Sequence, residues 1–526
     1  LIAGLPVLGL ALVNYYKLLL RNDPLLFEDM LLVSEAGNIS GRYQFTVGPL
    51  VILSVAAAVA GLVWLIVREK RRTRPNRMTR FAGMIFCAMA LALTIGFVGP
   101  SEALYRATGS SASGAWTPTN SYVFRGMLYP FLHSASQALD TLPAGYDEKQ
   151  EAAARAAYQD ENLPEDKKVN YVCVMLEAMN DFSAFEDVEI DPSVYAPLHA
   201  LQSEGTSGHL ITNIFAGGTV DTERCFLTGW LTGDSPRASV DSFVWYFRSQ
   251  GYATCGTHPW YSWFYNRSNI NEHLGFERYD FLEQRYMDED GTQHTSDEMF
   301  FDAVYGDLQA AKAEDKPLFS YSLSYQNHGP YPAEKQYDEP LCVWKYGYND
   351  ADYQIFNNYL TGVKDTWARL SAMVERLRAD DAPVVLVVFG DHNPWLGDGN
   401  SVYQMLGIDL DQSTEAGLLN YYRTPYLVWQ NDAAKQALGV PLPREGGDMG
   451  PYYLMPSVMQ WAGLKGSAAM QALLAQKADC SFVNPAGLAW QGKLYRLDDT
   501  VCTEALSTLK CRDYYARHLF SYRQAR

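Results

Sequence analysis

Two uncharged segments near the start of the chain, separated by a short basic stretch, constrain its fold more than any other feature. Residues 45–67 and residues 81–101 contain no Asp, Glu, Lys or Arg. At 1.5 Å per residue, an α-helix of either length crosses the roughly 30 Å hydrocarbon layer of a bilayer. The sequence therefore predicts two transmembrane helices.

The connector between these segments, residues 68–80, predicts their orientation. Seven of its thirteen residues are Lys or Arg, and basic loops of this kind stay on the cytoplasmic side. We therefore expect everything after residue 101 to lie outside the cytoplasm. Residues 1–16 form a further apolar run, typical of the end of an earlier span, so the protein is expected to pass through the membrane several times.

The charge of the chain excludes one class of function. The formal net charge is −18, and an acidic surface repels nucleic acid instead of releasing its counterions. The basic connector flanked by two spans is better explained by membrane topology. No nucleic-acid partner is expected.

The pattern changes after the membrane region. Residues 109–120 are small, polar and turn-forming, as in a surface linker, and residues 146–162 are typical of an exposed, Ala-rich helix. The predicted organisation is a transmembrane region over 1–101, a linker with a helix over 102–167, a catalytic domain over 168–465 and a C-terminal accessory lobe over 466–526.

From residue 168 onward, short apolar runs alternate with helical stretches. Such continuous runs suit strands that are buried on both faces, and residues 352–378 have the apolar spacing of a helix that covers a sheet. We therefore predict an α/β fold with a central, mostly parallel sheet flanked by helices. The runs are VNYVCVMLE, HLITNIF, YATCGTH, PLFSYSLSY, PVVLVVFGD and TPYLVW.

The eight cysteines are too few for a disulfide scaffold, and their spacing matches no zinc motif. Three of them lie in apolar surroundings and are interpreted as small core residues: Cys173, Cys225 and Cys255. A bridge is conceivable among three near the C-terminus if the domain is exported: Cys480, Cys502 and Cys511.

Two predicted strands end in side chains that suit a metal site. Glu177 follows the first apolar run, where a buried carboxylate is unfavourable unless it is paired or bound to metal. Asp391 and His392 follow another run and offer an oxygen and a nitrogen ligand at the carboxyl end of the sheet, where α/β folds bind ligands. Either pattern alone could be an ordinary strand ending.

A third ending carries a hydroxyl group. Gly217 and Gly218 allow a tight turn that leaves Thr219 at the start of a predicted helix. Thr219 is either a nucleophile or simply the cap of that helix.

Taken together, these motifs resemble the lipoteichoic acid synthase family, membrane phosphoglycerol transferases with a sulfatase-like domain of the alkaline phosphatase superfamily. The resemblance covers nearly the whole chain. It rests on five motifs: Leu176-Glu177, the Gly217-x-Thr219-x-Asp221 block, Tyr265-Asn266-Arg267, the run from Asn327 to Tyr331, and Gly390-Asp391-His392.

The resemblance implies roles for individual residues. One divalent metal, usually manganese although magnesium or zinc would also fit, is held by Glu177, Thr219, Asp391 and His392, and Thr219 is also the nucleophile. Arg267 and His328 contact the substrate phosphate, and His328 also transfers a proton. His258 lies near the head group. From the residues alone, Arg267 could instead be an exposed structural arginine and His328 a satisfied buried histidine.

The implied reaction moves glycerol phosphate from a phosphatidylglycerol-like lipid to a glycolipid or polyglycerol-phosphate acceptor, in a bacterial cell membrane with the catalytic domain outside. Phosphoethanolamine transfer, ester hydrolysis and a catalytically silent binding protein are the alternatives. Sulfatases usually carry a C/S-x-P-x-R motif, which this sequence lacks.

Two segments depart from the family pattern. Pro259-Trp260-Tyr261 stands where an acidic substrate contact is expected, and Asn393-Pro394-Trp395-Leu396 is more apolar than expected after the Gly-Asp-His motif. Both departures bear on the substrate and leave the predicted metal ligands and nucleophile intact.

Overall fold

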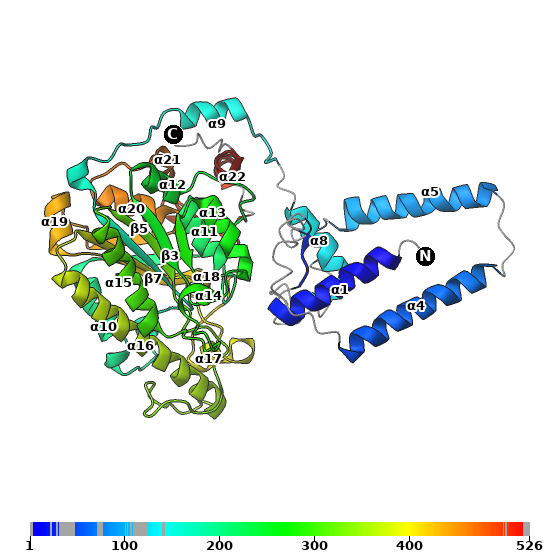
Figure 1. Ribbon diagram of the computed structural model, residues 1–526, viewed down its shortest axis with the longest axis horizontal. Coiled ribbons are helices and arrows are strands. Elements are labelled where there is room, and N and C mark those ends of the chain that lie inside the picture. Colours follow the sequence, from blue (N-terminus) through cyan, green and yellow to red (C-terminus); the bar gives the residue numbers. More distant parts are fainter. Residues whose placement is uncertain are drawn as a thin grey trace. The chain divides into compact units, whose positions relative to one another are not determined.

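A computed structural model gives the architecture of the chain (Figure 1). It describes residues 4–21, 48–70, 77–99, 125–138, 142–497 and 502–518, with isolated positions between these ranges. The chain divides into two compact units, Leu1–Leu142 and Pro143–Arg526. The predicted linker at 109–120 and residues 71–76 of the basic connector lie outside the described residues.

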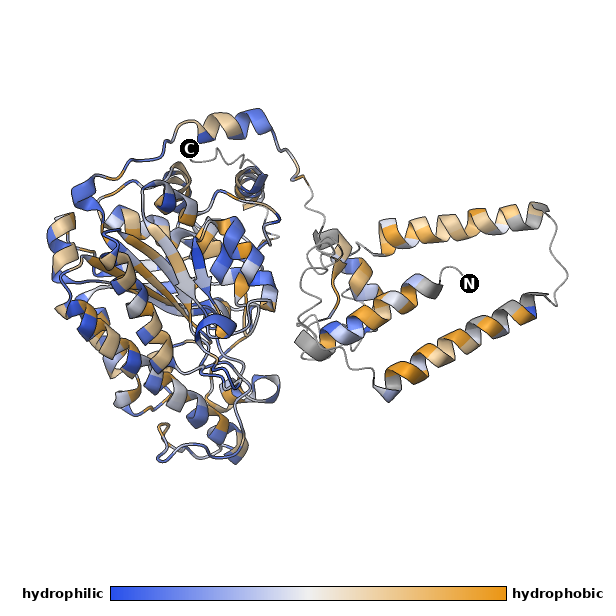
Figure 2. Ribbon diagram, in the orientation of Figure 1, coloured by the Kyte–Doolittle hydropathy of each residue, from blue (hydrophilic) through white to orange (hydrophobic). Residues whose placement is uncertain are grey.

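The first unit contains the predicted spans as helices, which are predominantly hydrophobic in Figure 2. Within the described residues, one helical stretch is long and apolar enough to cross a membrane: Phe81–Val98, with a mean hydropathy of 2.3 and no buried residues. The other predicted span contains a shorter apolar stretch, Val51–Gly61. The helices are α1 (Gly4–Arg21), α4 (Pro49–Lys70), α5 (Arg77–Leu93) with a π-helical continuation (Thr94–Val98), and α8 (Leu128–Ala138).

The second unit is built on an eight-stranded sheet with the order β4-β3-β5-β1-β6-β7-β2-β8. Strand β7 is antiparallel to both of its neighbours, and the other pairs are parallel. The predicted fold class is confirmed. The strands are β1 (Asn170–Leu176), β2 (Thr206–Ile211), β3 (Ala253–Thr257), β4 (Arg278–Asp280), β5 (Leu318–Leu323), β6 (Val384–Gly390), β7 (Arg423–Gln430) and β8 (Glu445–Met449).

The central strands β1 and β6 are buried along their whole length. Alternate side chains of each strand point to opposite faces. Tyr171 and Cys173 belong to the core on one face, whereas Val172 and Val174 belong to the core on the other. This is why the two runs are continuously apolar rather than alternating in polarity.

Helices cover both faces of the sheet (Figure 1). The core that contains Val172 is completed by α10 (Ala196–Glu204), α15 (Asp297–Ala313) and α16 (Asp350–Ala379), which confirms the helix predicted over 352–378. The core that contains Tyr171 is completed by α11 (Val220–Thr228), α12 (Phe243–Ser249) and α20 (Leu454–Trp461). Shorter helices are α13 (Arg267–Leu274), α14 (Leu282–Arg285), α17 (Ser401–Met405), α18 (Glu415–Tyr422) and α19 (Asp432–Leu438).

Two strands of the eight-stranded sheet were not predicted, and both are short edge strands with polar sequences. β4 has the sequence RYD and β8 the sequence EGGDM. Polar residues at sheet edges discourage pairing with other chains, and they also remove the hydrophobic signal on which a prediction from sequence depends.

The C-terminal part combines α21 (Ala468–Lys477), α22 (Thr503–His518) and a small antiparallel sheet of β9 (Cys480–Val483), β10 (Leu488–Trp490) and β11 (Lys493–Tyr495). Cys480, Cys502 and Cys511 are buried free thiols, so the conceivable bridge among them is not formed. The predicted Ala-rich helix is α9 (Glu148–Arg155), shorter than the pattern suggested, and its Glu151 is buried.

Candidate active site and metal centre

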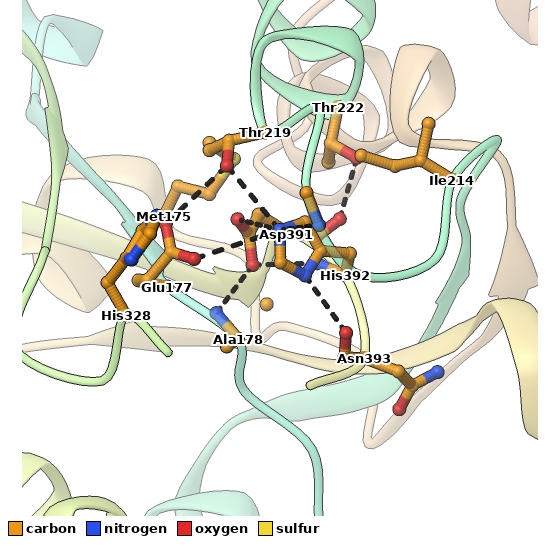
Figure 3. Close-up of polar contacts among 12 residues, drawn as sticks. Met175, Glu177, Ala178, Ile214, Thr219, Thr222, His328, Asp391, His392 and Asn393 are labelled. Atoms are coloured by element: carbon orange, nitrogen blue, oxygen red, sulfur yellow. Dashed lines mark hydrogen bonds and ion pairs between the residues drawn. The ribbon is translucent and has the colours of Figure 1, made fainter. Parts of the chain in front are cut away.

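The site lies where β1 and β6 end side by side. Leu176 pairs with Gly390 in this parallel pair, so the next residues, Glu177 and Asp391, leave the sheet at the same level. Carboxylate oxygens of Glu177 and Asp391 and a ring nitrogen of His392 lie within 4.8 Å of one another, and all three residues are buried (Figure 3). Sheet pairing thus brings together residues that are more than two hundred positions apart.

Thr219 completes this group from the N-terminal end of α11. Its side chain makes no capping hydrogen bond to the helix, so the simple capping role considered from the sequence is wrong. The Oγ1 atom instead lies 3.5 Å from Glu177 Oε2 and 3.4 Å from His392 Nε2. Thr219 is 7% exposed, which leaves its hydroxyl directed into the cluster.

The turn before Thr219 depends on glycine. Gly217 and Gly218 have φ angles of 89° and 75°, a region that residues with a Cβ rarely occupy. The Gly217 N–H donates to His392 Nε2 at 2.9 Å. The turn therefore holds the imidazole as well as presenting the hydroxyl.

The hydrogen bonds of His392 and Asp391 fit a bound cation. His392 Nδ1 lies 3.0 Å from the carbonyl of Asn393, an obligate acceptor, so Nδ1 carries the hydrogen and Nε2 keeps its lone pair. Asp391 Oδ1 accepts from the N–H groups of Ala178 and His392, both at 2.7 Å. Asp391 Oδ2 is buried and has no hydrogen-bond partner among the described residues. The Nε2 lone pair, which accepts from Gly217 N–H, and the unpaired Asp391 Oδ2 are ligand atoms of the kind that a divalent cation binds.

The electrostatics of the cluster also favour a bound cation. Burial raises the pKa of Glu177 to about 8, with the Asp391 carboxylate as the next largest cause, whereas His392 and Arg267 act in the opposite direction. Two buried carboxylates at this distance are difficult to ionise together without a compensating positive charge. A cation would supply that charge.

Two polar residues that the sequence did not assign to the site hold the cluster in place. Thr222 Oγ1 donates to the backbone carbonyl of Asp391 at 2.7 Å. Asn393 Nδ2 donates to the backbone carbonyls of Asn420, Tyr421 and Arg423 at 2.9–3.3 Å. Both side chains are completely buried, and nothing in their sequence context separates them from ordinary buried polar residues.

Arg267 is not the exposed arginine that was one alternative. It begins α13, is 2% exposed, and its Nε donates to Glu223 Oε2 at 2.9 Å. The two terminal nitrogens have no hydrogen-bond partner among the residues that the structure describes. A buried guanidinium fixed through Nε presents a two-pronged donor to an anion such as phosphate. Glu223 is a further residue that the sequence did not reveal.

The two predicted substrate histidines differ in environment. His258 follows β3 and is buried, with Nδ1 donating to the Leu323 carbonyl at 3.0 Å. Burial, followed by the charge of Arg267, holds the pKa of His258 well below its ordinary value, so this ring is neutral. His328 is exposed, and its Nδ1 donates to the Gly329 carbonyl at 2.7 Å. The buried histidine considered as an alternative is therefore excluded for His328.

The two departures from the family pattern lie in different surroundings. Leu396 is buried, and Trp395 packs edge-on against Phe215 with 6.4 Å between ring centroids, so that segment contributes to the core. Trp260 is only partly buried and stacks on Tyr325. A separate cavity of about 240 Å³ lies between α9, α21 and α22, and none of the predicted site residues lines it.

Known proteins resemble this chain over most of its length. A Rhizobium meliloti (strain 1021) protein named for cyclic beta-1,2-glucan modification is 25% identical over 496 residues, which cover 88% of this chain and 73% of that protein. The capsular polysaccharide biosynthesis protein RkpI of the same organism is 24% identical, over 51% of this chain and 46% of that protein.

Two solved structures share the fold. The Streptococcus pyogenes phosphoglycerol transferase GacH, in complex with sn-glycerol-1-phosphate, is 18% identical with a TM-score of 0.53, covering 72% of this chain and 95% of that one. The lipoteichoic acid synthase LtaP from Listeria monocytogenes is 19% identical with a TM-score of 0.50, covering 71% of this chain and 97% of that one.

The sequence itself assigns the family. Residues 169–464, more than half of the chain, match the Sulfatase family. This range contains the eight-stranded sheet and all the residues of the cluster. The chain belongs to the Sulfatase family.

Proposed function

We propose that this protein is a membrane-anchored, metal-dependent transferase that moves glycerol phosphate from a phosphatidylglycerol-like lipid to an acceptor hydroxyl through Thr219. The observation that carries the proposal is the position of Thr219 Oγ1, which caps no helix and faces Glu177 and His392 at 3.5 Å and 3.4 Å. A hydroxyl at the N-terminal end of α11 is also well placed for an incoming phosphate, because backbone N–H groups and the helix dipole favour an anion there.

The residues present fit one divalent cation. Glu177, Asp391, His392 and Thr219 would hold it, and we expect manganese. When bound, such a cation lowers the pKa of a threonine hydroxyl and screens the charge of the incoming phosphate.

In the first half of the reaction, Thr219 Oγ1 forms a bond to the donor phosphorus, and the bond from phosphorus to the diacylglycerol oxygen breaks. The threonine proton passes to solvent, and His328 Nε2 delivers a proton to the leaving oxygen, so diacylglycerol departs as an alcohol. The product on the enzyme is a glycerophosphoryl ester of Thr219. The two terminal nitrogens of Arg267 donate to phosphate oxygens and stabilise the charge of the transition state.

In the second half, an acceptor hydroxyl attacks the same phosphorus, the bond from phosphorus to Thr219 Oγ1 breaks, and Thr219 takes up a proton from solvent. His328 is the proposed proton carrier. Because Nδ1 is engaged with the Gly329 carbonyl, Nε2 is the nitrogen that can give a proton to the diacylglycerol oxygen and then take one from the acceptor hydroxyl.

We propose a glycan as the acceptor. A glycolipid or a polyglycerol-phosphate chain is expected from the lipoteichoic acid synthase resemblance, whereas the name of the Rhizobium relative favours a glucan. The apolar helix Phe81–Val98 would tether the catalytic unit on the outer face of a bacterial cell membrane. A tether of this kind raises the effective concentration of a lipid donor.

The decisive experiment uses the full chain in nanodiscs that contain acyl-labelled phosphatidylglycerol and manganese. Diacylglycerol release and the mass of the Thr219 peptide are measured for the wild type and for Thr219→Ala. Thr508→Ala, an exposed threonine on α22, is the matched control. We expect release and a glycerophosphoryl adduct from the wild type and the control, and neither from Thr219→Ala.

The same assay separates the alternatives. Release from phosphatidylethanolamine instead of phosphatidylglycerol would indicate phosphoethanolamine transfer, and free glycerol phosphate as the main product would indicate a hydrolase. Undiminished release from Thr219→Ala, or no release from the wild type with either lipid, would overturn the proposal.

A further inference from the structure

We propose that the outer face of Trp260, supported by Tyr325 stacked behind it, forms a subsite on which a sugar ring of the acceptor glycan stacks next to the phosphate-binding residues. This inference rests on the proposed function and specifies its acceptor site. No residue of the predicted metal cluster or nucleophile belongs to the subsite.

The neighbouring strands β3 and β5 bring the two rings together. These strands are parallel, and Cys255 pairs with Ser320. Trp260 and Tyr325 each lie five positions beyond their paired residue, so both leave the sheet at the same edge. Their rings stack with centroids 4.1 Å apart and planes at 12°.

The ring of His328 extends this stack. His328 stacks on Tyr325 at 4.9 Å and 19°, and Tyr261 packs against Trp260 in a T-shaped arrangement at 5.2 Å and 70°. Trp260, Tyr261 and Tyr325 are partly buried and His328 is exposed, so this aromatic surface remains accessible. The negative face of an aromatic ring attracts the weakly positive C–H groups on the apolar face of a pyranose.

The polar atoms of these rings suit a sugar better than a lipid chain. Trp260 Nε1 and Tyr325 Oη have no hydrogen-bond partner among the described residues. Burial raises the pKa of Tyr325, with the charge of Glu177 as the second cause, so its hydroxyl keeps the proton that it can donate. Together with His328 Nε2, the surface offers three polar groups around flat apolar faces. Acyl chains have no groups that could form hydrogen bonds with these three polar groups.

The subsite adjoins the residues proposed to handle phosphate. The ring of His258 lies 6.1 Å from that of Tyr325. His258 is in turn influenced by the charges of Arg267 and His328. A sugar on the outer face of Trp260 would therefore bind in the neighbourhood of the residues proposed to handle phosphate, where the acceptor is needed in the second half of the reaction.

The test measures binding of a cyclic β-1,2-glucan to the full chain in nanodiscs by isothermal titration calorimetry. We expect Trp260→Leu and Trp260→Ala to raise the Kd about tenfold, the upper range of a single aromatic contact, and Trp260→Phe to stay within about threefold because it keeps a ring. Trp344→Ala is the matched control, since Trp344 is 50% exposed and packs against Tyr348 and Tyr353 instead. Thermal unfolding of each variant verifies folding.

Three results with the variants would overturn the subsite. They are an unchanged glucan Kd in folded Trp260→Leu, an equal loss in Trp344→Ala, and weaker binding of phosphatidylglycerol vesicles by Trp260→Leu with glucan binding intact. Diacylglycerol release by the wild type without glucan binding would also overturn it while leaving donor cleavage standing. Failure of the subsite is thus distinguishable from failure of the proposed function.

Discussion

The Oδ2 atom of Asp391 lies 3.1 Å from the Nε2 atom of His392. The backbone fixes both side chains in this arrangement, through Ala178 N–H on Asp391 and Gly217 N–H on His392. The carboxylate oxygen and the ring nitrogen are thus held close together as ligand atoms for a divalent cation.

Manganese should therefore stabilise the wild-type protein. At a concentration one hundred times its Kd, a ligand of the folded state adds about 2.7 kcal/mol to the free energy of unfolding, which a thermal unfolding curve with and without metal detects. Asp391→Asn and His392→Ala should lose this gain, and Asp398→Asn, at an exposed position, should keep it. An unchanged gain in both cluster variants would argue against the metal site.

Thr219 should contribute little to stability although the proposed reaction depends on it. Because its side chain makes no capping bond, we expect Thr219→Ala to lower the free energy of unfolding by less than the ~1 kcal/mol of a lost cap. Ser242 is the comparison, since its Oγ accepts from Trp245 N–H at 3.2 Å at the start of α12. Ser242→Ala should lower it by about 1 kcal/mol or more, and equal losses in chemical denaturation would contradict the assignment.

Glu223 should be needed for both folding and donor binding. It pairs with Arg267, and both side chains are 3% exposed. Removing one partner of a buried ion pair leaves an uncompensated charge, so Glu223→Ala should lower the free energy of unfolding by ~3–5 kcal/mol.

Replacing both partners separates the two roles. Glu223→Met combined with Arg267→Met removes the charges together, and replacements of this kind are often neutral or stabilising. We expect the double variant to recover most of the stability but none of the donor cleavage. Recovery of cleavage without Arg267 would show that the guanidinium does not bind phosphate.

Asp297 should make stability depend on pH. Burial raises the pKa of this carboxyl from 3.8 to about 7, and Asp365 acts in the same direction, against Thr366 and Arg369. The folded state therefore holds a proton that the unfolded chain releases near pH 4. This contribution is complete below pH 4 and is lost as the pH rises to about 7.

Asp297→Asn should flatten that decline. The difference in slope is at most about 1.4 kcal/mol per pH unit between pH 5 and pH 7, and thermal unfolding of the full chain across this range measures it. Asp338→Asn, at an exposed position, is the control. Parallel declines in the wild type and Asp297→Asn would mean that Asp297 is ionised in the folded protein.

The strands that the sequence predicted best were those with continuous apolar runs. The runs that became β1 and β6 are buried on both faces, so the same residues indicated the sheet class and the position of its carboxyl end. The location of Glu177 and Asp391 at this end of the sheet could therefore be predicted, because each is the first residue after its strand. The meeting of these two residues with Thr219 was predicted only through the family resemblance.

Contacts between distant segments were beyond prediction. The stacking of Trp260 on Tyr325 depends on β3 lying beside β5, and no local pattern encodes that order of strands. The burial of Arg267 similarly depends on Glu223, forty-four positions earlier in the chain. Charged side chains are usually exposed, so a sequence alone favours the wrong environment for such a pair.

The pairing of Leu176 with Gly390 has a consequence for how such an enzyme can change. Glu177 and Asp391 inherit their spacing from the backbone ladder of the sheet, whereas Trp260 and Tyr325 stand on segments beyond β3 and β5. Substitutions in residues 259–266, whether they arise in evolution or by design, can therefore change the proposed subsite. The positions of Glu177 and Asp391 would stay the same.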